Sequence, residues 1–126
     1  IAIRIDEPLT VRGDWDELVQ VVQNLVENAL KYAASGKRIE VEGRRDGDDV
    51  ELSVRDFGPG IDEVHIPRLT ERFYRINAQE SRQRGGTGLG LAIVKHILNR
   101  HQARLRISSQ RGAGSTFTVR IPAFTK

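Results

Sequence analysis

The sequence predicts an α+β fold, a two-layer α/β sandwich in which helices cover one face of a mixed β-sheet. Apolar and polar residues alternate in several short segments, so each predicted strand has one apolar and one polar face. Two longer segments repeat their apolar residues at helical spacing. Along the chain these segments run strand, helix, paired strands, loop, helix, paired strands, an order typical of two packed layers.

Strict alternation of apolar and polar side chains marks the strands. They are predicted at residues 1–6, 39–42, 50–55, 105–107 and 117–121. A single residue or short pair around residues 9–11 is expected to add an edge strand. Glycine-containing turns at residues 46–48 and 112–114 are typical of hairpins and join the paired strands.

Two helices are predicted, the first over Trp15–Tyr32 and the second over residues 88–101. Asp14 is the expected N-cap of the first helix and Gly36 its expected C-terminal stop. The apolar stripe of the first helix consists of Leu18, Val22, Leu25 and Ala29. That of the second consists of Leu89, Ile93 or Val94, Ile97 and Leu98. The polar stretch at residues 77–86 predicts a mobile loop.

The composition excludes several classes of protein. A chain of 126 residues suits one domain, and the absence of cysteine excludes disulfide scaffolds, thiolate zinc sites and cysteine nucleophiles. The histidines, His65, His96 and His101, are scattered, which argues against a histidine-rich metal site. No apolar run is long enough to span a membrane, and no signal-peptide pattern opens the chain. Because the chain opens directly on a strand, with Ile at residue 1, we interpret it as a piece of a longer protein, with residues 1–126 forming one domain.

Charge is unevenly distributed along the chain. The net charge is +3, but residues 1–67 carry −7 and residues 68–111 carry +8. A concentrated positive field favours a polyanion as partner. Nucleic acid and a nucleoside triphosphate are both polyanions, so the charge distribution does not decide between these two partners.

Asp56 continues the inward phase of the strand at residues 50–55, so its carboxylate is expected to point toward the core. A buried charge needs hydrogen-bond donors, and the exocyclic amine of a base would supply one. The following turn, residues 57–60, contains Gly58 and Gly60, which allow the backbone to approach a flat ligand. The alternative is a carboxylate held only by the amides of the turn.

The first helix carries a polar stripe of Gln20, Asn24, Asn28 and Lys31. Asparagine is a poor helix former, so two asparagines four residues apart need an explanation. Amide oxygens facing a cleft can hold Mg²⁺ when phosphates supply the other ligands, and Lys31 would meet a phosphate. The alternative is a solvated face, which suits Gln20 well and Asn28 badly.

The second helix is preceded by a glycine-rich run at residues 84–90. Its spacing fits neither the dinucleotide-binding fingerprint nor the Walker loop, but it leads into a helix N-terminus, which favours an anion. Structural glycines at a helix–sheet contact are the alternative. Earlier, at residues 71–75, Phe73 is expected to anchor a hinge and Arg75 to reach a phosphate, unless Arg72 and Arg75 are only solvated charges.

Taken together, these segments resemble the ATP-binding catalytic domain of sensor histidine kinases, within the wider family of DNA gyrase, Hsp90 and MutL, and so imply a Bergerat-type fold. Residues 24–32, 56–60, 71–75, 86–90 and 112–117 are similar to the N, G1, F and G2 boxes and the last glycine motif. Residues 69–98 are most similar to phosphate-regulon sensor kinases.

The resemblance implies that Asp56 recognises the adenine amine, with Thr87 helping through water, and that Asn28 holds Mg²⁺ with help from Asn24. The other implied nucleotide-binding residues are Lys31, Tyr32, Gly58, Gly60, Arg75, Gly88, Leu89, Gly90, Leu91 and Thr116. The sequence leaves open whether Ser115 or Thr116 faces the pocket. Residues 77–86 would form the ATP lid.

The resemblance also implies a mechanism and partners. Gyrase-type hydrolases place a general-base glutamate at the position of Asn24, and an amide cannot take that proton, so hydrolysis is expected to be slow. The γ-phosphoryl would pass to a histidine on a separate dimerisation domain and then to a response regulator, with no nucleic-acid partner. The domain would be cytoplasmic, in a bacterial inner-membrane sensor that reaches the membrane through other segments. The alternatives are a basic nucleic-acid-binding module and a related domain with serine-kinase or non-catalytic output.

Overall fold

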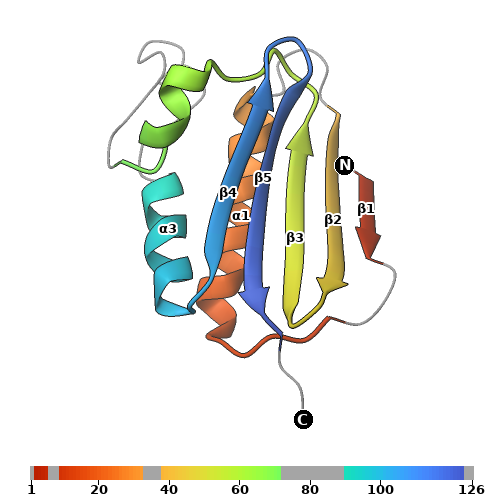
Figure 1. Ribbon diagram of the computed structural model, residues 1–126, viewed down its shortest axis with the longest axis vertical. Helices are drawn as coiled ribbons and strands as arrows, with labels where there is room; N and C mark the ends of the chain where they lie inside the picture. Colours follow the sequence, from red (N-terminus) through yellow and green to blue (C-terminus); the bar gives the residue numbers. More distant parts are fainter. Residues whose placement is uncertain (1, 6–8, 33–37, 72–89, 124–126) are drawn as a thin grey trace.

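A computed structural model of the chain describes residues 2–5, 9–32, 38–71 and 90–123 (Figure 1). In chain order the elements are β1 (Ala2–Ile5), α1 (Trp15–Tyr32), β2 (Ile39–Asp46), β3 (Asp49–Asp56), the 3₁₀ helix η1 (Glu63–Arg68), α3 (Gly90–Arg100), β4 (Arg104–Gln110) and β5 (Gly114–Pro122). The predicted stop at Gly36 and the predicted loop at residues 77–86 lie outside the described residues.

The five strands form one mixed sheet in the order β1-β2-β3-β5-β4. Only β1 and β2 pair in parallel, and the other neighbours are antiparallel. Figure 1 shows α1 behind the sheet and α3 beside it. The two-layer α+β fold is therefore confirmed. The edge strand expected around residues 9–11 is reduced to a single bridge between Val11 and Ala123.

The core lies between the helices and the apolar face of the sheet. From α1 it takes Val21, Leu25 and Ala29, so the prediction that Val22 lies in the core was wrong. Val22 is 37% exposed and Val21 only 2%, because one step along a helix rotates the side chain by about 100°. In α3 the buried side consists of Leu91, Val94, Ile97 and Leu98, with Val94 rather than Ile93 fully buried.

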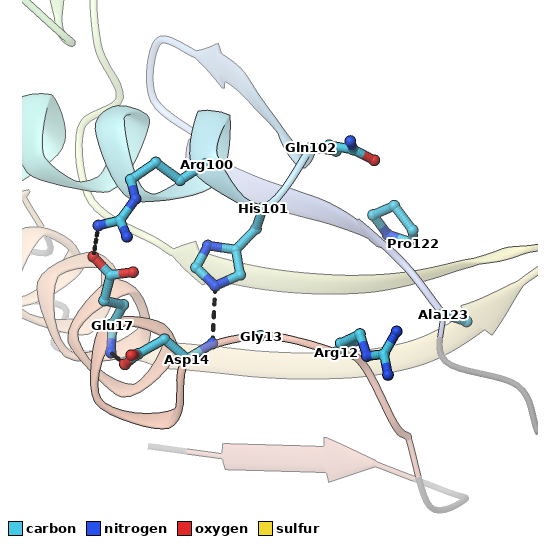
Figure 2. A pocket seen from close by; sticks show the side chains of 9 residues that line it. All are labelled: Arg12, Gly13, Asp14, Glu17, Arg100, His101, Gln102, Pro122 and Ala123. Carbon is cyan, nitrogen blue, oxygen red and sulfur yellow. Dashed lines mark hydrogen bonds and ion pairs between the residues drawn. The ribbon is translucent and has the colours of Figure 1, made fainter.

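The first turn of α1 is fixed by its own cap and by α3. The Glu17 backbone N–H donates to Asp14 Oδ1 at 3.0 Å, which confirms Asp14 as the N-cap. His101, the residue after α3, accepts a hydrogen bond at its Nε2 from the backbone N–H of Asp14, with a distance of 3.1 Å. Arg100, the last residue of α3, forms an ion pair of 2.6 Å with the Glu17 carboxylate. Figure 2 shows both contacts. Since Ile97 O lies 2.8 Å from the other ring nitrogen of His101, this ring is held on both sides.

The helices α1 and α3 run in opposite directions (Figure 1). The His101 cluster joins the beginning of α1 to the end of α3. At the opposite end of the molecule lie the C-terminus of α1, the C-terminus of β3 and the β4–β5 hairpin, and the N-terminus of α3 faces toward this end (Figure 1). No helix in the described segments has the length and apolar character needed to cross a membrane.

Candidate functional site

Asp56 is the last residue of β3 and is fully buried, as its inward phase predicted. Its Oδ1 accepts the Gly58 backbone N–H at 3.0 Å. Its Oδ2 is buried and has no hydrogen-bond partner within the described part of the chain. Burial raises the pKa of the Asp56 carboxyl, and the backbone amides of Gly58 and Ser115 oppose this shift. The turn therefore satisfies one carboxylate oxygen and leaves the other, which is buried, without a donor among the described residues.

The backbone packs closely around Asp56, and two glycines permit this. Gly114 has φ +96°, and a Cβ there would overlap the main-chain oxygen of Asp56. Gly60 has φ +83°, and a Cβ there would overlap the main-chain oxygen of Gln110. Gly60 thus lets its turn pack against the β4–β5 hairpin, where the Gly112 N–H donates to Pro59 O at 2.8 Å. These contacts hold the strand end that carries the carboxylate.

The register of β3 and β5 decides between Ser115 and Thr116. Ser115 lies opposite Asp56 and is 1% exposed, with its Oγ 2.9 Å from Ser109 Oγ. Thr116 lies opposite Arg55 and lines a shallow groove on the sheet face that the helices leave uncovered. Because side chains alternate along a strand, Thr116 points away from the Asp56 face. Ser115 therefore shares the buried face of the sheet with Asp56, and Thr116 lies on the opposite face.

The two asparagines of the polar stripe of α1 are both half-buried. Asn24 is half-buried, and its Nδ2 donates to Gly90 O at 3.3 Å. Asn28 is also half-buried, and its Nδ2 has no hydrogen-bond partner among the described residues. Lys31 is half-buried and Gln20 is exposed. A solvated face therefore accounts for Gln20 and not for the two asparagines.

The N-terminus of α3 faces toward the end of the sheet at which β3 terminates (Figure 1). The first backbone N–H groups of a helix have no partner within the helix and favour an anion. A Cβ at Gly90 would meet no described residue within 4 Å, so the described part of the chain leaves space beside the first residue of α3. The Leu91 side chain belongs to the core, which leaves only its backbone for a ligand.

Several predicted binding residues stay predictions. Arg75, Thr87, Gly88 and Leu89 lie outside the described residues, as does the side chain of Tyr32. Within the described segments no three His, Cys, Asp or Glu side chains gather as a metal site. A divalent cation bound beside α1 would thus take its ligands from amide oxygens and from the phosphates of a nucleotide, which is a common arrangement for Mg²⁺.

A family model described as the histidine kinase-, DNA gyrase B-, and HSP90-like ATPase matches residues 13–125. The chain belongs to this ATPase family. It is therefore an ATP-binding domain, and the basic nucleic-acid-binding alternative is not favoured.

Relatives place this ATPase domain among sensor kinases. It is 52% identical over 108 residues to the phosphate regulon sensor protein PhoR of Pseudomonas aeruginosa, covering 86% of this chain and 24% of PhoR. It is 44% identical over 126 residues to the sensor-like histidine kinase SenX3 of Mycolicibacterium smegmatis, covering 98% of this chain and 33% of SenX3. The chain thus spans about a quarter to a third of these curated relatives.

Solved structures share the fold of the domain. The mycobacterial sensor histidine kinase MprB superimposes with a TM-score of 0.84 at 30% identity, covering 99% of this chain and 82% of that one. Full-length ShkA in complex with AMPPNP superimposes with a TM-score of 0.82 at 28% identity, covering 99% of this chain and 26% of that one. The fold is that of histidine kinase catalytic domains.

Proposed function

We propose that the domain binds Mg-ATP at the end of the sheet where β3 terminates, and that it donates the γ-phosphoryl group to a histidine on a separate dimerisation domain. The observation that carries the proposal is the Asp56 carboxylate, fully buried with Oδ2 unpartnered in the described part of the chain. A buried acceptor of this kind is costly unless a ligand donates to it.

Asp56 would read the base. Its Oδ2 accepts a hydrogen from the exocyclic amine of adenine, and a charged acceptor makes a short, strong hydrogen bond. Guanine carries an acceptor oxygen at the equivalent position of the ring, which would face the carboxylate repulsively. Burial of Asp56 and of the neighbouring Ser115 keeps water from competing for this contact. The domain would therefore prefer ATP to GTP.

The phosphates would lie along α1 and the beginning of α3. Asn28, whose buried amide nitrogen has no partner in the described segments, fits as a ligand of Mg²⁺ once its amide turns its oxygen toward the ion. The bond from Asn24 to Gly90 O fixes the Asn24 amide beside it. Mg²⁺ would neutralise charge on the phosphates during transfer. Lys31 and the free amides of α3 would hold the remaining phosphate oxygens.

The site contains no base for water at the position of Asn24, because a neutral amide cannot accept a proton. Hydrolysis would therefore be slow, and the γ-phosphoryl would instead be attacked by a histidine nitrogen, with ADP as the leaving group. His101 is not that acceptor, since both of its ring nitrogens contact the backbone. Positioning and charge neutralisation would supply the catalysis, as in phosphoryl transfer generally.

The relatives support this assignment of roles. PhoR and SenX3 are named as sensor proteins and are several times longer than the matched region, so the acceptor histidine would lie elsewhere in such a protein. The AMPPNP complex of ShkA shows an ATP analogue bound to a protein of the same fold. The partners would then be the dimerisation domain of the same protein and a response regulator, on the cytoplasmic side of a bacterial membrane.

Phosphotransfer to a second protein tests the proposal. The chain is incubated with radiolabelled Mg-ATP, alone and with a PhoR variant whose own ATP-binding domain is disabled. We expect no label on the chain alone and acid-labile, alkali-stable label on the PhoR variant. Acid-labile label on the chain itself would contradict the separate acceptor. Tight Mg-ATP binding without any transfer would contradict the kinase activity and leave nucleotide binding standing.

A further inference from the structure

A cavity lies between η1, α3 and β4, away from Asp56. Its volume is about 460 Å³. Apolar side chains from all three elements line it, among them Ile66, Leu98, Leu105 and Ile107. These side chains are buried or half-buried, so the groove has an apolar floor that is already part of the packed core.

The charged groups that line this groove are cationic among the residues that the structure describes. Lys95 from α3 and Arg104 from β4 line it, and no described lining residue is acidic. Both side chains are exposed, and neither forms an ion pair or a hydrogen bond with another side chain among the described residues. Several arginines elsewhere on the sheet form ion pairs, as Arg120 does with Asp49 at 2.7 Å. The groove therefore presents an unbalanced positive charge beside apolar surface.

The strand beside the groove is an edge strand. β4 pairs with β5 on one side, and no described strand pairs with its other side. The free backbone N–H and C=O groups of an edge strand can pair with an extended peptide. Along β4 the side chains alternate, with Arg104 and Arg106 exposed and with Leu105 and Ile107 half-buried toward the groove. In a strand added beside β4, one set of alternate side chains would lie next to the exposed arginines and the other set next to Leu105 and Ile107.

We propose that β4 and this groove bind an extended peptide segment of a partner protein that alternates acidic and apolar residues. The segment adds to the sheet as a sixth strand beside β4. Its apolar side chains enter the groove next to Leu105 and Ile107, and its carboxylates, on the opposite face of the added strand, lie beside Arg104 and Arg106. Lys95, at the rim of the groove, attracts the net negative charge of the peptide. Opposite charges on neighbouring strands attract, so the arginines select the acidic residues. This surface is independent of the proposed nucleotide site.

The test uses the complete 126-residue chain and a capped octapeptide of alternating valine and glutamate. Nuclear magnetic resonance on the isotope-labelled chain should show shifts confined to β4, η1 and α3, with new exchange protection at β4 amides. A peptide with lysine in place of glutamate should not bind. A peptide N-methylated at every second amide should lose binding, because it cannot pair with the strand edge. Absence of binding, shifts mapping elsewhere or equal binding of either control peptide would overturn the proposal.

Two charge reversals test the role of the cations. Arg106→Glu on β4 and Lys95→Glu on α3 should each weaken the valine–glutamate peptide about tenfold, since a repulsive contact replaces an attractive one. Arg45→Glu makes the same charge change in the β2 strand, far from the groove, and should leave the affinity unchanged. Thermal stabilisation by Mg-ATP should be equal in all these variants, which shows that they fold. Equal affinity of all variants would overturn the charge selection.

Discussion

The side-chain amide of Asn24 in α1 donates a 3.3 Å hydrogen bond to the main-chain oxygen of Gly90, the first residue of α3. At the other end of α3, Arg100 pairs at 2.6 Å with Glu17 in the first turn of α1. The helix α3 is therefore tied to α1 near both of its own ends. This arrangement holds the amide flank of α1 beside the free N-terminus of α3, where the phosphates are proposed to bind.

Replacing Asn24 should weaken Mg-ATP binding. Asn24→Ala removes the bond to Gly90 O, which contributes about 1 kcal/mol to stability, together with an amide oxygen near the proposed magnesium ion. We expect about a tenfold loss of affinity by isothermal titration calorimetry. Gln20→Ala, one turn earlier on the same stripe but exposed, is the matched control and should bind normally. Equal affinity of both variants would remove Asn24 from the site.

Asn28→Ala should abolish the dependence of ATP binding on magnesium. The buried amide nitrogen of Asn28 has no partner in the described residues, so the substitution breaks no described hydrogen bond of that nitrogen and removes one proposed ligand of the ion. We expect the affinity for ATP to be the same with Mg²⁺ and with a chelator. Glu27→Ala, exposed on the neighbouring position, should keep the magnesium dependence of the wild type. A retained metal response in Asn28→Ala would assign the ion to other residues.

Much of the fold could be predicted because its signals are local. The alternation of β2 and β3 and the cap at Asp14 each lie within a few residues of sequence. The choice between Val21 and Val22 could not be made locally, since both are apolar and only the position of the sheet decides which one is buried.

In the candidate site, too, some features could be predicted from local sequence and others could not. Asp56 was predicted to point inward from the phase of its own strand, and it does. The choice of Ser115 over Thr116 depends on the register between β3 and β5, which brings residues 56 and 115 together. Likewise, no local pattern indicates that His101 accepts a hydrogen bond from Asp14, 87 positions earlier.

Asp56→Asn should separate binding from stability. The amide retains an oxygen for the Gly58 N–H but presents a donor to the adenine amine and removes a buried charge. We therefore expect the free protein to melt at the same or a higher temperature at neutral pH, while stabilisation by Mg-ATP disappears. Asp48→Asn, an exposed carboxylate in the β2–β3 turn, should keep that stabilisation. Undiminished ATP binding by Asp56→Asn would show that the base is recognised elsewhere.

The same carboxyl should make stability depend on pH. Burial raises the pKa of Asp56, opposed by the amides of Gly58 and Ser115, so the folded chain binds a proton more tightly than the unfolded chain. This contribution is fully present below the unfolded pKa and is lost as pH rises through the folded pKa. We therefore expect that, in urea denaturation between about pH 4 and pH 8, the free energy of unfolding of Asp56→Asn increases relative to that of the wild type as the pH rises. A constant difference would contradict the raised pKa.

The glycine that packs against Asp56 should be more sensitive than its neighbour in the same turn. Gly112 and Gly114 both have positive φ, +83° and +96°, so alanine is strained at either position. A Cβ at Gly112 meets nothing within 4 Å, whereas one at Gly114 overlaps the main-chain oxygen of Asp56. We expect Gly112→Ala to cost about 1 kcal/mol and Gly114→Ala about 3 kcal/mol or more by chemical denaturation.

The two glycine variants should also differ in ligand binding. The overlap at Gly114 can be relieved only by moving the end of β3 or the start of β5, and either shift displaces the Asp56 carboxylate. Gly114→Ala should therefore lose Mg-ATP affinity at temperatures where it remains folded, as judged by circular dichroism, while Gly112→Ala binds normally. Equal stability of the two variants would show that the ends of β3 and β5 can shift to accommodate the Cβ without loss of unfolding free energy. A folded Gly114→Ala with full affinity would show that binding does not require the carboxylate at this position.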